Sequence, residues 1–342
     1  MLEVAPCADD EWDRIASAQA RATVFHTREW LELIVAVSGA ELRLCRFEAG
    51  GRVAGAAALF LFRRGPFRLA ASPPPQAAVP YLGPLVDDAL ATQALAALCD
   101  EARRQGAVYF ETRLAFEPPQ ADLVAAGFAV EARATFVLDL APGPEVLWER
   151  SLTSACRRAV RKAESSGVIV EEADLEEILP RYYAMAESVF AKWDRPPPLS
   201  LDDYRRIAAA QRRGGPVKVF AARLEGVVVA AGIFPHGSGA VYYLDGVSDP
   251  SGQAARPNNL LHWHVIQWAC GAGVRQYDMV GAGIAGVARF KESFGPALVP
   301  YTYAFRNLSQ LAGVARAAYA RLAPAARSLQ YGLGRLLRAT RS

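Results

Sequence analysis

The sequence predicts an α/β protein in which one mixed-sheet unit occurs twice along the chain. Three observations predict it. The 342-residue length exceeds that of one ordinary compact core. Two similar series of turns, strands and helices follow each other about half a chain apart. Hydrophobic residues make up 52% of the sequence, which is enough for a large core.

Each series predicts two upstream helices, a hairpin, a strand containing Tyr-Leu, a long helix, a short strand ending in an acid, and a closing strand. In the first half these elements are expected at 8–19, 28–37, 42–47, 53–62, Tyr81-Leu82, 89–105, 108–111 and 133–140. In the second half they are expected at 175–191, 200–213, 217–222, 227–234, Tyr243-Leu244, 257–270, 275–278 and 299–305. Superposing Gly106 on Gly273 also superposes Glu111 on Asp278.

The segment Ala141-Pro142-Gly143-Pro144 breaks regular structure and predicts a domain boundary. We therefore expect an N-terminal domain at 1–141 and a C-terminal domain at 145–306. Residues 307–342 contain six arginines and no acid among Leu and Ala residues at helical spacing. This pattern predicts a basic amphipathic helical tail, which would suit an anionic membrane surface or an RNA backbone.

Charge and cysteine usage exclude several classes of protein. The net charge of +3 is too small to identify a nucleic-acid binder. The five cysteines are scattered without a Cys-x-x-Cys pair, which favours a reducing compartment over a disulfide framework or a zinc site. His262 and His264 lie two apart and diverge on a helix, so we expect no metal. The acidic N-terminus and the short apolar run at 53–62 predict a cytoplasmic protein, or one peripheral at the inner membrane.

A basic cluster follows the boundary. On a helix, Arg157 lies beside Arg161 and Arg158 beside Lys162, which gives one cationic face. Arginine forks bind phosphate in two-point fashion, so this face suits a nucleotide-linked, lipid-linked or tRNA substrate. A solvated helix face is the equally weighted alternative.

Two further stretches of the second half suit ligand binding. Asn258 and Asn259 follow Pro257 at an expected helix start, which is an anion site or ordinary capping. The glycine-rich segment 281–286 would let backbone approach a ligand, and it leads into Arg289 and Phe290. It lacks the spacing of a dinucleotide or P-loop motif, so it is weak evidence by itself.

These residues carry a family resemblance. The run Asn258-Asn259-Leu260-Leu261, the segment from Gly273 to Gly281, and Phe290-Lys291-x-x-Phe294-Gly295 resemble the second domain of Fem-type transferases. The basic helix at 157–163 and the segment from Phe25 to Trp30 resemble further parts of that family. The resemblance covers about residues 20–306.

The resemblance implies two tandem domains of the GNAT type and transfer of an aminoacyl or acyl group to an amine. The implied donors are aminoacyl-tRNA and acyl-coenzyme A, neither of them a tightly bound cofactor. The implied acceptor is a cell-envelope glycan or a peptidoglycan-type precursor, with tRNA as a further partner. The phosphate loop of ordinary GNAT enzymes is absent at 251–257.

Acyl transfer needs a deprotonated amine and donors for the oxyanion that forms on the carbonyl. Lys291 is the candidate for charge stabilisation; the alternatives are a phosphate contact and a surface lysine paired with Glu292. Asp245 and Asp278 are candidate bases or amine ligands, or structural carboxylates. Three aromatic residues would wall a sugar or acyl pocket or serve the core: Trp193, Tyr242 and Tyr243.

A second class of function stays open from the sequence. A duplicated fold without activity would serve as a scaffold for exopolysaccharide assembly at the inner membrane surface. The arginine-rich tail suits the enzyme and the scaffold equally.

Overall fold

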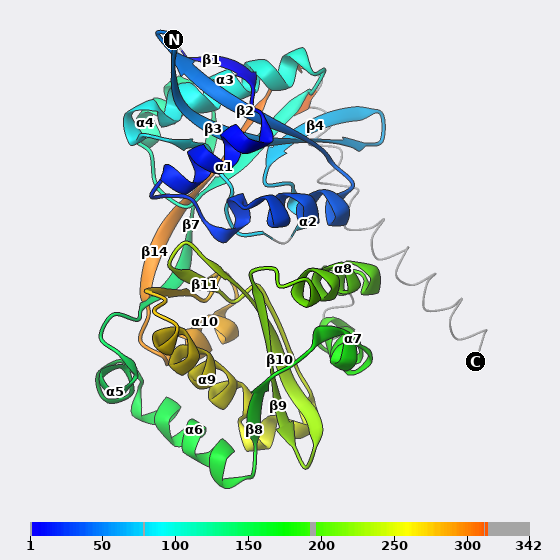
Figure 1. Ribbon diagram of the computed structural model, residues 1–342, viewed down its shortest axis with the longest axis vertical. Helices are drawn as coiled ribbons and strands as arrows, with labels where there is room; N and C mark the ends of the chain where they lie inside the picture. The colour runs from blue at the N-terminus through cyan, green and yellow to red at the C-terminus, as the bar shows by residue number, and fades with distance from the viewer. Residues whose placement is uncertain (1, 78, 192–195, 311, 314–342) are drawn as a thin grey trace, which may run out of the picture.

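The computed structural model describes residues 2–77, 79–191, 196–310, 312 and 313. The chain forms two stacked halves, with the first half blue to cyan and the second half green to yellow (Figure 1). The candidate Trp193 and nearly all of the basic tail lie outside the described residues. No helix in the described part of the chain combines the length and the apolar character needed to cross a membrane.

Most described elements follow the predicted order with boundaries shifted by a few residues, and the strands predicted at Tyr81-Leu82 and Tyr243-Leu244 are the exceptions. The first half contains β1 (Glu3–Pro6), α1 (Asp9–Ala18), α2 (Arg28–Ser38), β2 (Glu41–Ala49), β3 (Arg52–Arg64), β4 (Phe67–Ser72), β5 (Leu85–Val86), α3 (Ala91–Arg104), β6 (Tyr109–Leu114), α4 (Gln120–Ala125) and β7 (Ala129–Asp139). The second contains α5 (Pro144–Val146), α6 (Ser154–Ser165), β8 (Ile169–Glu172), α7 (Leu175–Ala191), α8 (Leu201–Arg212), β9 (Val217–Leu224), β10 (Val227–Gly237), β11 (Ala240–Tyr242), β12 (Asp245–Ser248), α9 (Pro257–Gly271), β13 (Gln276–Asp278), α10 (Ala285–Glu292) and β14 (Ala297–Asn307).

The two halves exchange their closing strands. In the described residues the strand order is β1-β2-β3-β4-β6-β14-β7-β13-β11-β10-β9-β8, with β5 on β3 and β12 on β10. Thus β14, the last strand of the second half, pairs with β6, whereas β7 of the first half pairs with β13. The two exchanged strands also pair with each other and run between the halves (Figure 1). One mixed sheet therefore passes through the whole molecule, in agreement with the predicted α/β fold class.

The exchange bears on the predicted division of the chain at 141–145. A cut there would separate each half from the strand that completes its sheet. The domain limits stay a prediction.

The duplication extends to the two acids that superpose in the sequence. Glu111 pairs across the sheet with Ala71, and Asp278 pairs with Tyr242, each in a parallel ladder. Each acid also accepts a hydrogen bond from a hydroxyl on the exchanged strand. Tyr303 donates to Glu111 at 2.8 Å, and Thr135 donates to Asp278 at 2.6 Å. The repeat is therefore a repeat of contacts and not of element order alone.

The two Tyr-Leu pairs do not lie inside strands. In the first half the strand is β4, and Tyr81-Leu82 lie in the irregular segment that follows it. In the second half Tyr243 and Leu244 separate β11 from β12. The Leu244 amide bonds the Tyr242 carbonyl two residues back, and this tight turn interrupts the strand.

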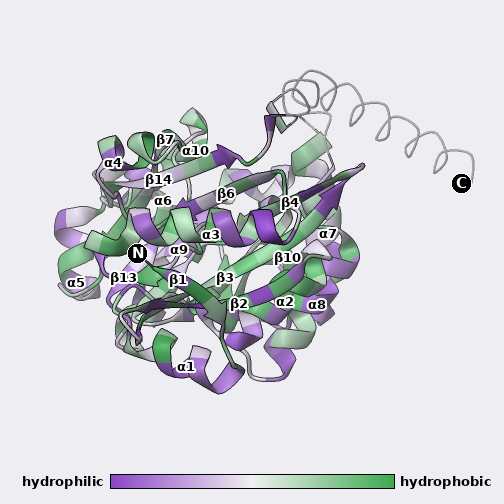
Figure 2. Ribbon diagram, turned by 90° about the horizontal axis from the view of Figure 1, so that it is seen from above, coloured by the Kyte–Doolittle hydropathy of each residue, from purple (hydrophilic) through white to green (hydrophobic). Residues whose placement is uncertain are grey.

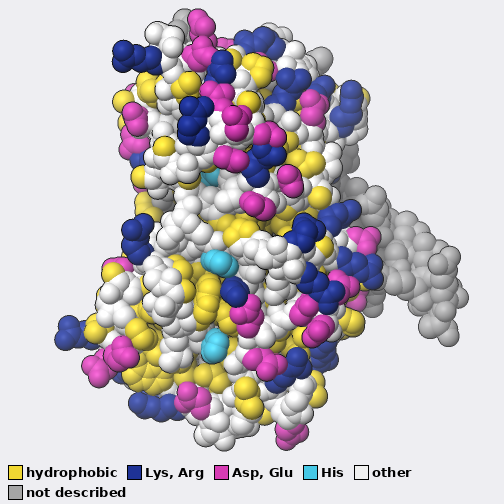
Figure 3. All heavy atoms as spheres, in the orientation of Figure 1, with side chains coloured by type: hydrophobic (Ala, Val, Ile, Leu, Met, Phe, Trp, Pro, Cys, Tyr) yellow, Lys and Arg dark blue, Asp and Glu magenta, His cyan; other side chains and the backbone are white. Residues whose placement is uncertain are grey.

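The core is shared between the halves. One buried cluster draws on α1 and α2 of the first half and on α7 and α8 of the second. Within it the Phe25 and Tyr242 rings lie 4.8 Å apart. A second cluster lies under α6 and α9, and a third lies under α3, whose hydrophilic and hydrophobic residues alternate as stripes in Figure 2. On the face drawn in Figure 3, acidic and basic side chains are interspersed, so no large patch of one sign forms there.

Candidate active site

The site lies where two parallel strands of the second half separate. β11 and β13 pair over three residues, ending at Tyr242 opposite Asp278. Beyond that point β12 stays with β10, whereas Met279 donates its amide to Phe136 of β7. Residues 243–246 are consequently only half-buried. Ligands of open α/β sheets bind where strands separate in this way.

Asp278 is buried at the end of β13 and is held from three directions. Its Oδ2 accepts a hydrogen bond from the Tyr81 hydroxyl at 2.8 Å. Its Oδ1 accepts from the Thr135 hydroxyl at 2.6 Å and from the Val280 amide at 2.8 Å. Burial raises the pKa of Asp278 while these donors oppose the shift, so the carboxyl is a stronger base than an exposed one. Both halves of the molecule position it.

Lys291 lies on α10 with only 5% of its surface exposed. Its Nζ donates to the carbonyls of Val280 and Gly281, the latter at 2.9 Å. Both carbonyls belong to left-handed residues, with φ of 49° and 71°. Burial lowers the pKa of Lys291 to about 8, against the opposing effect of Asp278. The surface pairing with Glu292 is therefore not what the structure shows.

Tyr243 forms one wall of this region. Its ring stacks on Phe234 with centroids 5.6 Å apart and meets His262 edge-on at 4.6 Å. The Lys291 Nζ lies 5.8 Å from the centre of the ring. A Cβ on Gly246 would come within 2.0 Å of the Tyr243 hydroxyl oxygen, so glycine is required there.

His262 is a neighbour that the sequence did not single out for this site. It is buried on α9, and its Nδ1 lies 2.7 Å from the Tyr277 hydroxyl. Burial, helped by the charge of Lys291, lowers its pKa to about 3, so the ring is neutral. Phe290 meets this ring edge-on at 5.2 Å. The ring thus links α9 to α10 as a packing group.

Asp245 occupies a separate position at the start of β12. Its Oδ2 accepts hydrogen bonds from Tyr182 of α7 at 2.8 Å and from Tyr204 of α8 at 2.6 Å. Burial raises the pKa of Asp245, and the two tyrosines oppose that shift. No sequence signal could have found these partners, because they lie 63 and 41 residues away.

The basic helix α6 does not present all four predicted cations in the same way. Arg157 turns back and donates to the carbonyls of Trp148, Glu149 and Leu152, so it caps the preceding turn. Arg161 is exposed and lies 5.5 Å from the centre of the Trp148 ring. Arg158 and Lys162 are also exposed.

The start of α9 lies against the start of α6. Pro257 occupies the first turn of α9, and no side chain caps that end. Asn259 instead donates from its amide to the Cys156 sulfur at 3.7 Å, and Asn258 is half-buried. The ordinary-capping explanation for these asparagines therefore does not describe the structure. Arg289 is exposed on α10.

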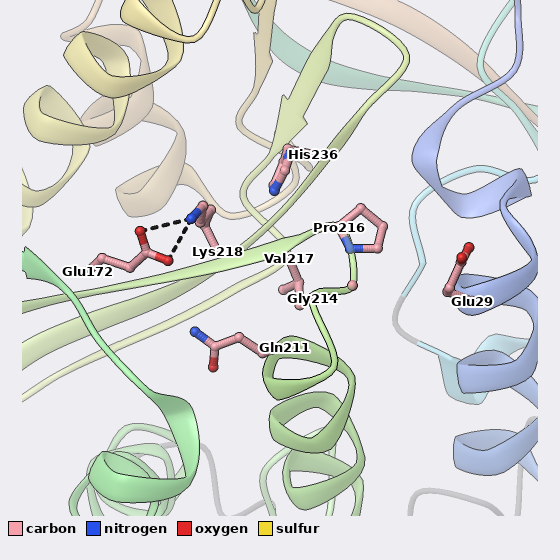
Figure 4. A pocket seen from close by; sticks show the side chains of 9 residues that line it. Glu29, Glu172, Gln211, Gly214, Pro216, Val217, Lys218 and His236 are labelled. Carbon is pink, nitrogen blue, oxygen red and sulfur yellow. Dashed lines mark hydrogen bonds and ion pairs between the residues drawn. The ribbon is translucent and has the colours of Figure 1, made fainter.

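A cavity of about 450 Å³ lies elsewhere, between α2 and the β8–β9–β10 edge (Figure 4). Its Lys218 pairs with Glu172 at 2.7 Å, and the Gln211 amide is engaged with backbone groups of Ala173 and Leu175. It contains none of the residues that the sequence singled out. No set of metal-ligating side chains occurs in the described part of the chain.

Comparisons with known proteins concern the fold and the second half of the chain. Residues 150–292 match the family model described as acetyltransferase (GNAT) domain. The whole fold is similar to the crystal structure of FemX, with a TM-score of 0.70 and 17% identity over 88% of this chain and 96% of that one. No curated protein has significant sequence similarity to the chain.

Two further solved structures share the fold. The C-terminal domain of a putative lysylphosphatidylglycerol synthetase from Agrobacterium fabrum gives a TM-score of 0.59 and 14% identity, covering 91% of this chain and 94% of that one. A tandem GNAT protein from the clavulanic acid biosynthesis pathway gives 0.55 and 14%, covering 90% and 99%. Residues 150–292 thus match a GNAT-type acetyltransferase domain, and the fold of the chain as a whole is similar to that of FemX and of a tandem GNAT protein.

Proposed function

We propose that the protein is an acyltransferase that acylates an amine of a cell-envelope glycan or a peptidoglycan-type precursor, with the chemistry in its second half. The observation that carries the proposal is Lys291, a buried amine of lowered pKa placed beside Asp278 and Tyr243 where the strands separate. Perturbed titratable groups of this kind concentrate at functional sites. The Fem-type resemblance and the fold shared with a synthetase of a lysylated lipid support an envelope acceptor.

The donor we favour is acyl-coenzyme A, because GNAT domains typically use it. Residues 250–255 form a 3-10 turn instead of the usual phosphate loop. The donor phosphates would therefore bind at the adjoining starts of α6 and α9. Arg158, Arg161 and Lys162 supply exposed cations there, and Asn258 lies in the first turn of α9, which no side chain caps. Aminoacyl-tRNA is the second donor, and its backbone suits the same cations.

The reaction joins an acceptor amine to the acyl carbon, and the bond from that carbon to the donor sulfur or oxygen breaks. The ammonium of Lys291 stabilises the oxyanion of the tetrahedral intermediate. Asp278 takes the proton that the amine loses, and the leaving thiolate or alkoxide takes a proton from water. Tyr81 and Thr135 hold the two Asp278 oxygens, and Asp245 would bind an amine on the acceptor side.

The inactive scaffold is the alternative, and the altered loop at 251–257 is the observation that favours it. Thiol release from acetyl-coenzyme A in the presence of amino sugars and amine-bearing glycan fragments tests the two. We expect Lys291→Met to lower the rate by about 10²–10³-fold. Lys218→Met, which removes a cation paired with Glu172, is the matched control and should leave the rate unchanged.

The donor is tested in the same preparation. Sensitivity of the transfer to ribonuclease, without thiol release, would identify a charged tRNA instead of acyl-coenzyme A. Wild-type protein that releases no thiol and attaches no aminoacyl group to any of the amines, yet supports polysaccharide production in cells, would favour the scaffold.

A further inference from the structure

The sheet face formed by β6, β14 and β7 carries arginines opposite tyrosines. Arg113 lies directly opposite Tyr303, and Arg133 lies directly opposite Tyr301. Directly opposed residues of an antiparallel pair project to the same face. The alternate residues Thr302 and Ala304 are buried on the other side. The four side chains therefore form one strip on a partly exposed surface.

This strip ends at the candidate base. Thr135 lies two residues beyond Arg133 on the same strand and face, and its hydroxyl donates to Asp278. Tyr301 meets the Tyr81 ring edge-on at 5.0 Å, and the Tyr81 hydroxyl also donates to Asp278. A molecule lying along the strip would present one end to Asp278.

Arg113 is a half-buried cation without an acidic partner. Its Nη2 contacts the carbonyls of Pro73 and Pro74 at 3.4 Å and 3.3 Å. No carboxylate lies within ion-pair distance of it among the described residues. The nearby Glu111 gives its carboxylate to the hydroxyls of Tyr109 and Tyr303 instead. Burial lowers the pKa of Arg113, the charge of Glu111 opposes this shift, and the charge of Arg133 adds to it.

Arg133 is the second cation, and two contacts fix the orientation of its guanidinium. Its guanidinium carbon lies 4.1 Å from the centre of the Tyr303 ring, and its Nη2 donates to Glu131 at 3.1 Å. Because Arg113 and Arg133 repel each other and of the two only Arg133 hydrogen bonds to a carboxylate, an oxyanion bound between them would satisfy both forks.

We propose that Arg113, Arg133 and Tyr301 form a subsite that binds an oxyanion-bearing sugar of the acceptor next to Asp278. The arginines take the oxyanion, a carboxylate or a phosphate, and Tyr301 offers its ring to the sugar. The inference rests on the proposed function in treating the bound molecule as the acceptor. The subsite lies on strands of both halves, so the first half contributes to acceptor recognition.

Thermal unfolding of the full chain tests the subsite without any transfer assay. D-glucuronate and glucose 6-phosphate are titrated at constant ionic strength, with D-glucose as the neutral probe. At least one anionic sugar should raise Tm in a saturable way, because a ligand that binds the folded state stabilises it by mass action, and D-glucose should not. A response to D-glucuronate alone identifies a carboxylate, and a response to glucose 6-phosphate alone identifies a phosphate.

Arg133→Ala and Arg113→Gln should each weaken this binding by about tenfold or more, as expected for hydrogen bonds to a charged group. Arg104→Ala, on the opposite side of the sheet and paired with Glu101, is the matched control and should bind as the wild type does. Should Arg113→Gln fail to fold, the more exposed Arg133→Ala decides alone.

Equal binding in wild type and Arg133→Ala would overturn the subsite, as would the absence of stabilisation by both anionic sugars. Loss of binding in Arg161→Ala with unchanged binding in Arg133→Ala would also count against the subsite, because the anionic sugar would then bind at the start of α6. A parallel titration with acetyl-coenzyme A separates this inference from the proposed function. A chain that binds acetyl-coenzyme A but no anionic sugar refutes the subsite alone, and the reverse result refutes the acyl donor alone.

Discussion

Each half contains a pair of parallel strands that separate, but the space beyond the separation is filled in one half and accessible in the other. In the first half β4 and β6 separate after Ser72, and residues 79–86 are all buried in the space beyond. The Ser72 hydroxyl donates to the Leu82 carbonyl, and the His26 ring contacts the Gly83 carbonyl at 3.3 Å. In the second half residues 243–246 are half-buried. The chain itself fills the first separation and leaves the second accessible.

The filling segment also serves the other half. Tyr81, which belongs to it, donates its hydroxyl to Asp278. The repeat therefore contains one accessible separation and one filled separation that supports it.

The largest effect is expected from the two superposed acids. Asp278→Asn should lower the rate of transfer by about 10²-fold or more, because an amide cannot take the proton of the amine. Glu111→Gln should leave the rate nearly unchanged, because no accessible separation adjoins that carboxylate. Steady-state rates of both variants, with melting curves to confirm folding, measure the contrast. Equal losses in the two variants would mean that both halves catalyse.

The pH dependence of the rate should follow Lys291. Its folded pKa of about 8 lies below the ordinary value of 10.5, so the protonated form is lost as the pH rises through about 8. Above that point the rate should fall by about tenfold per pH unit, because the oxyanion loses its cation. Rates measured at saturating substrate between about pH 6 and 10 test this fall, because that range brackets the pKa of Lys291. If the rate of Lys291→Met still falls above pH 8, another titrating group causes the fall.

The free energy of unfolding should also depend on the pKa of Lys291, and it should rise with pH where the rate falls. Between pH 8 and 10.5 the unfolded chain binds this proton more strongly than the folded chain does, so the free energy of unfolding rises with pH. Lys291→Met should lack this rise. Urea titrations at several pH values, compared between wild type and variant, measure it.

Two close-packed glycines should separate function from stability. Gly246→Ala would push against the Tyr243 hydroxyl, so it should cost about 1–3 kcal/mol and lower the rate as well. At Gly83 a Cβ would meet the end of the Leu114 side chain at 2.5 Å, which can rotate away. Gly83→Ala should therefore change the melting temperature modestly and the rate hardly at all. A large fall in the rate of Gly83→Ala would indicate that the first half contributes directly to catalysis.

The smallest effects are expected from the hydroxyls on the two acids. Tyr81→Phe and Tyr303→Phe should each cost about 0.5–1.5 kcal/mol, the net value of one hydrogen bond. Only Tyr81→Phe should also alter the pH profile of the rate, because only Asp278 takes part in the chemistry. Identical profiles in wild type and Tyr81→Phe would argue against a role for Asp278 as the base.

Local patterns were enough to predict most elements. The helix at 175–191 begins and ends as its apolar spacing indicates. The strand predicted at 275–278 ends at Asp278, whereas the one predicted at 108–111 continues to Leu114. The sequence missed β4 and placed a strand at Tyr81-Leu82, because a buried irregular segment is as apolar as a buried strand. Periodicity reports burial, and here burial did not require a strand.

Pairings over long distances could not be predicted. β7 and β14 each have a strand pattern, but nothing in either pattern specifies a partner in the other half. The same holds for the site. Lys291, Asp278 and Tyr243 were predicted from the resemblance, a strand end and a group of aromatic residues, whereas Tyr81 and Thr135 reach Asp278 only through the fold. Arg157 was predicted as a phosphate ligand, and in the structure it caps backbone carbonyls.

Because of the strand exchange, the chain cannot be cut between its halves without exposing a sheet edge. A fragment ending near residue 142 would keep β7 but lose β14, so β6 would present unpaired N–H and C=O groups to solvent. Such an edge recruits strands from other molecules and leads to aggregation. Removal of either half would therefore expose a sheet edge of the other, so we expect the two halves to unfold as one unit.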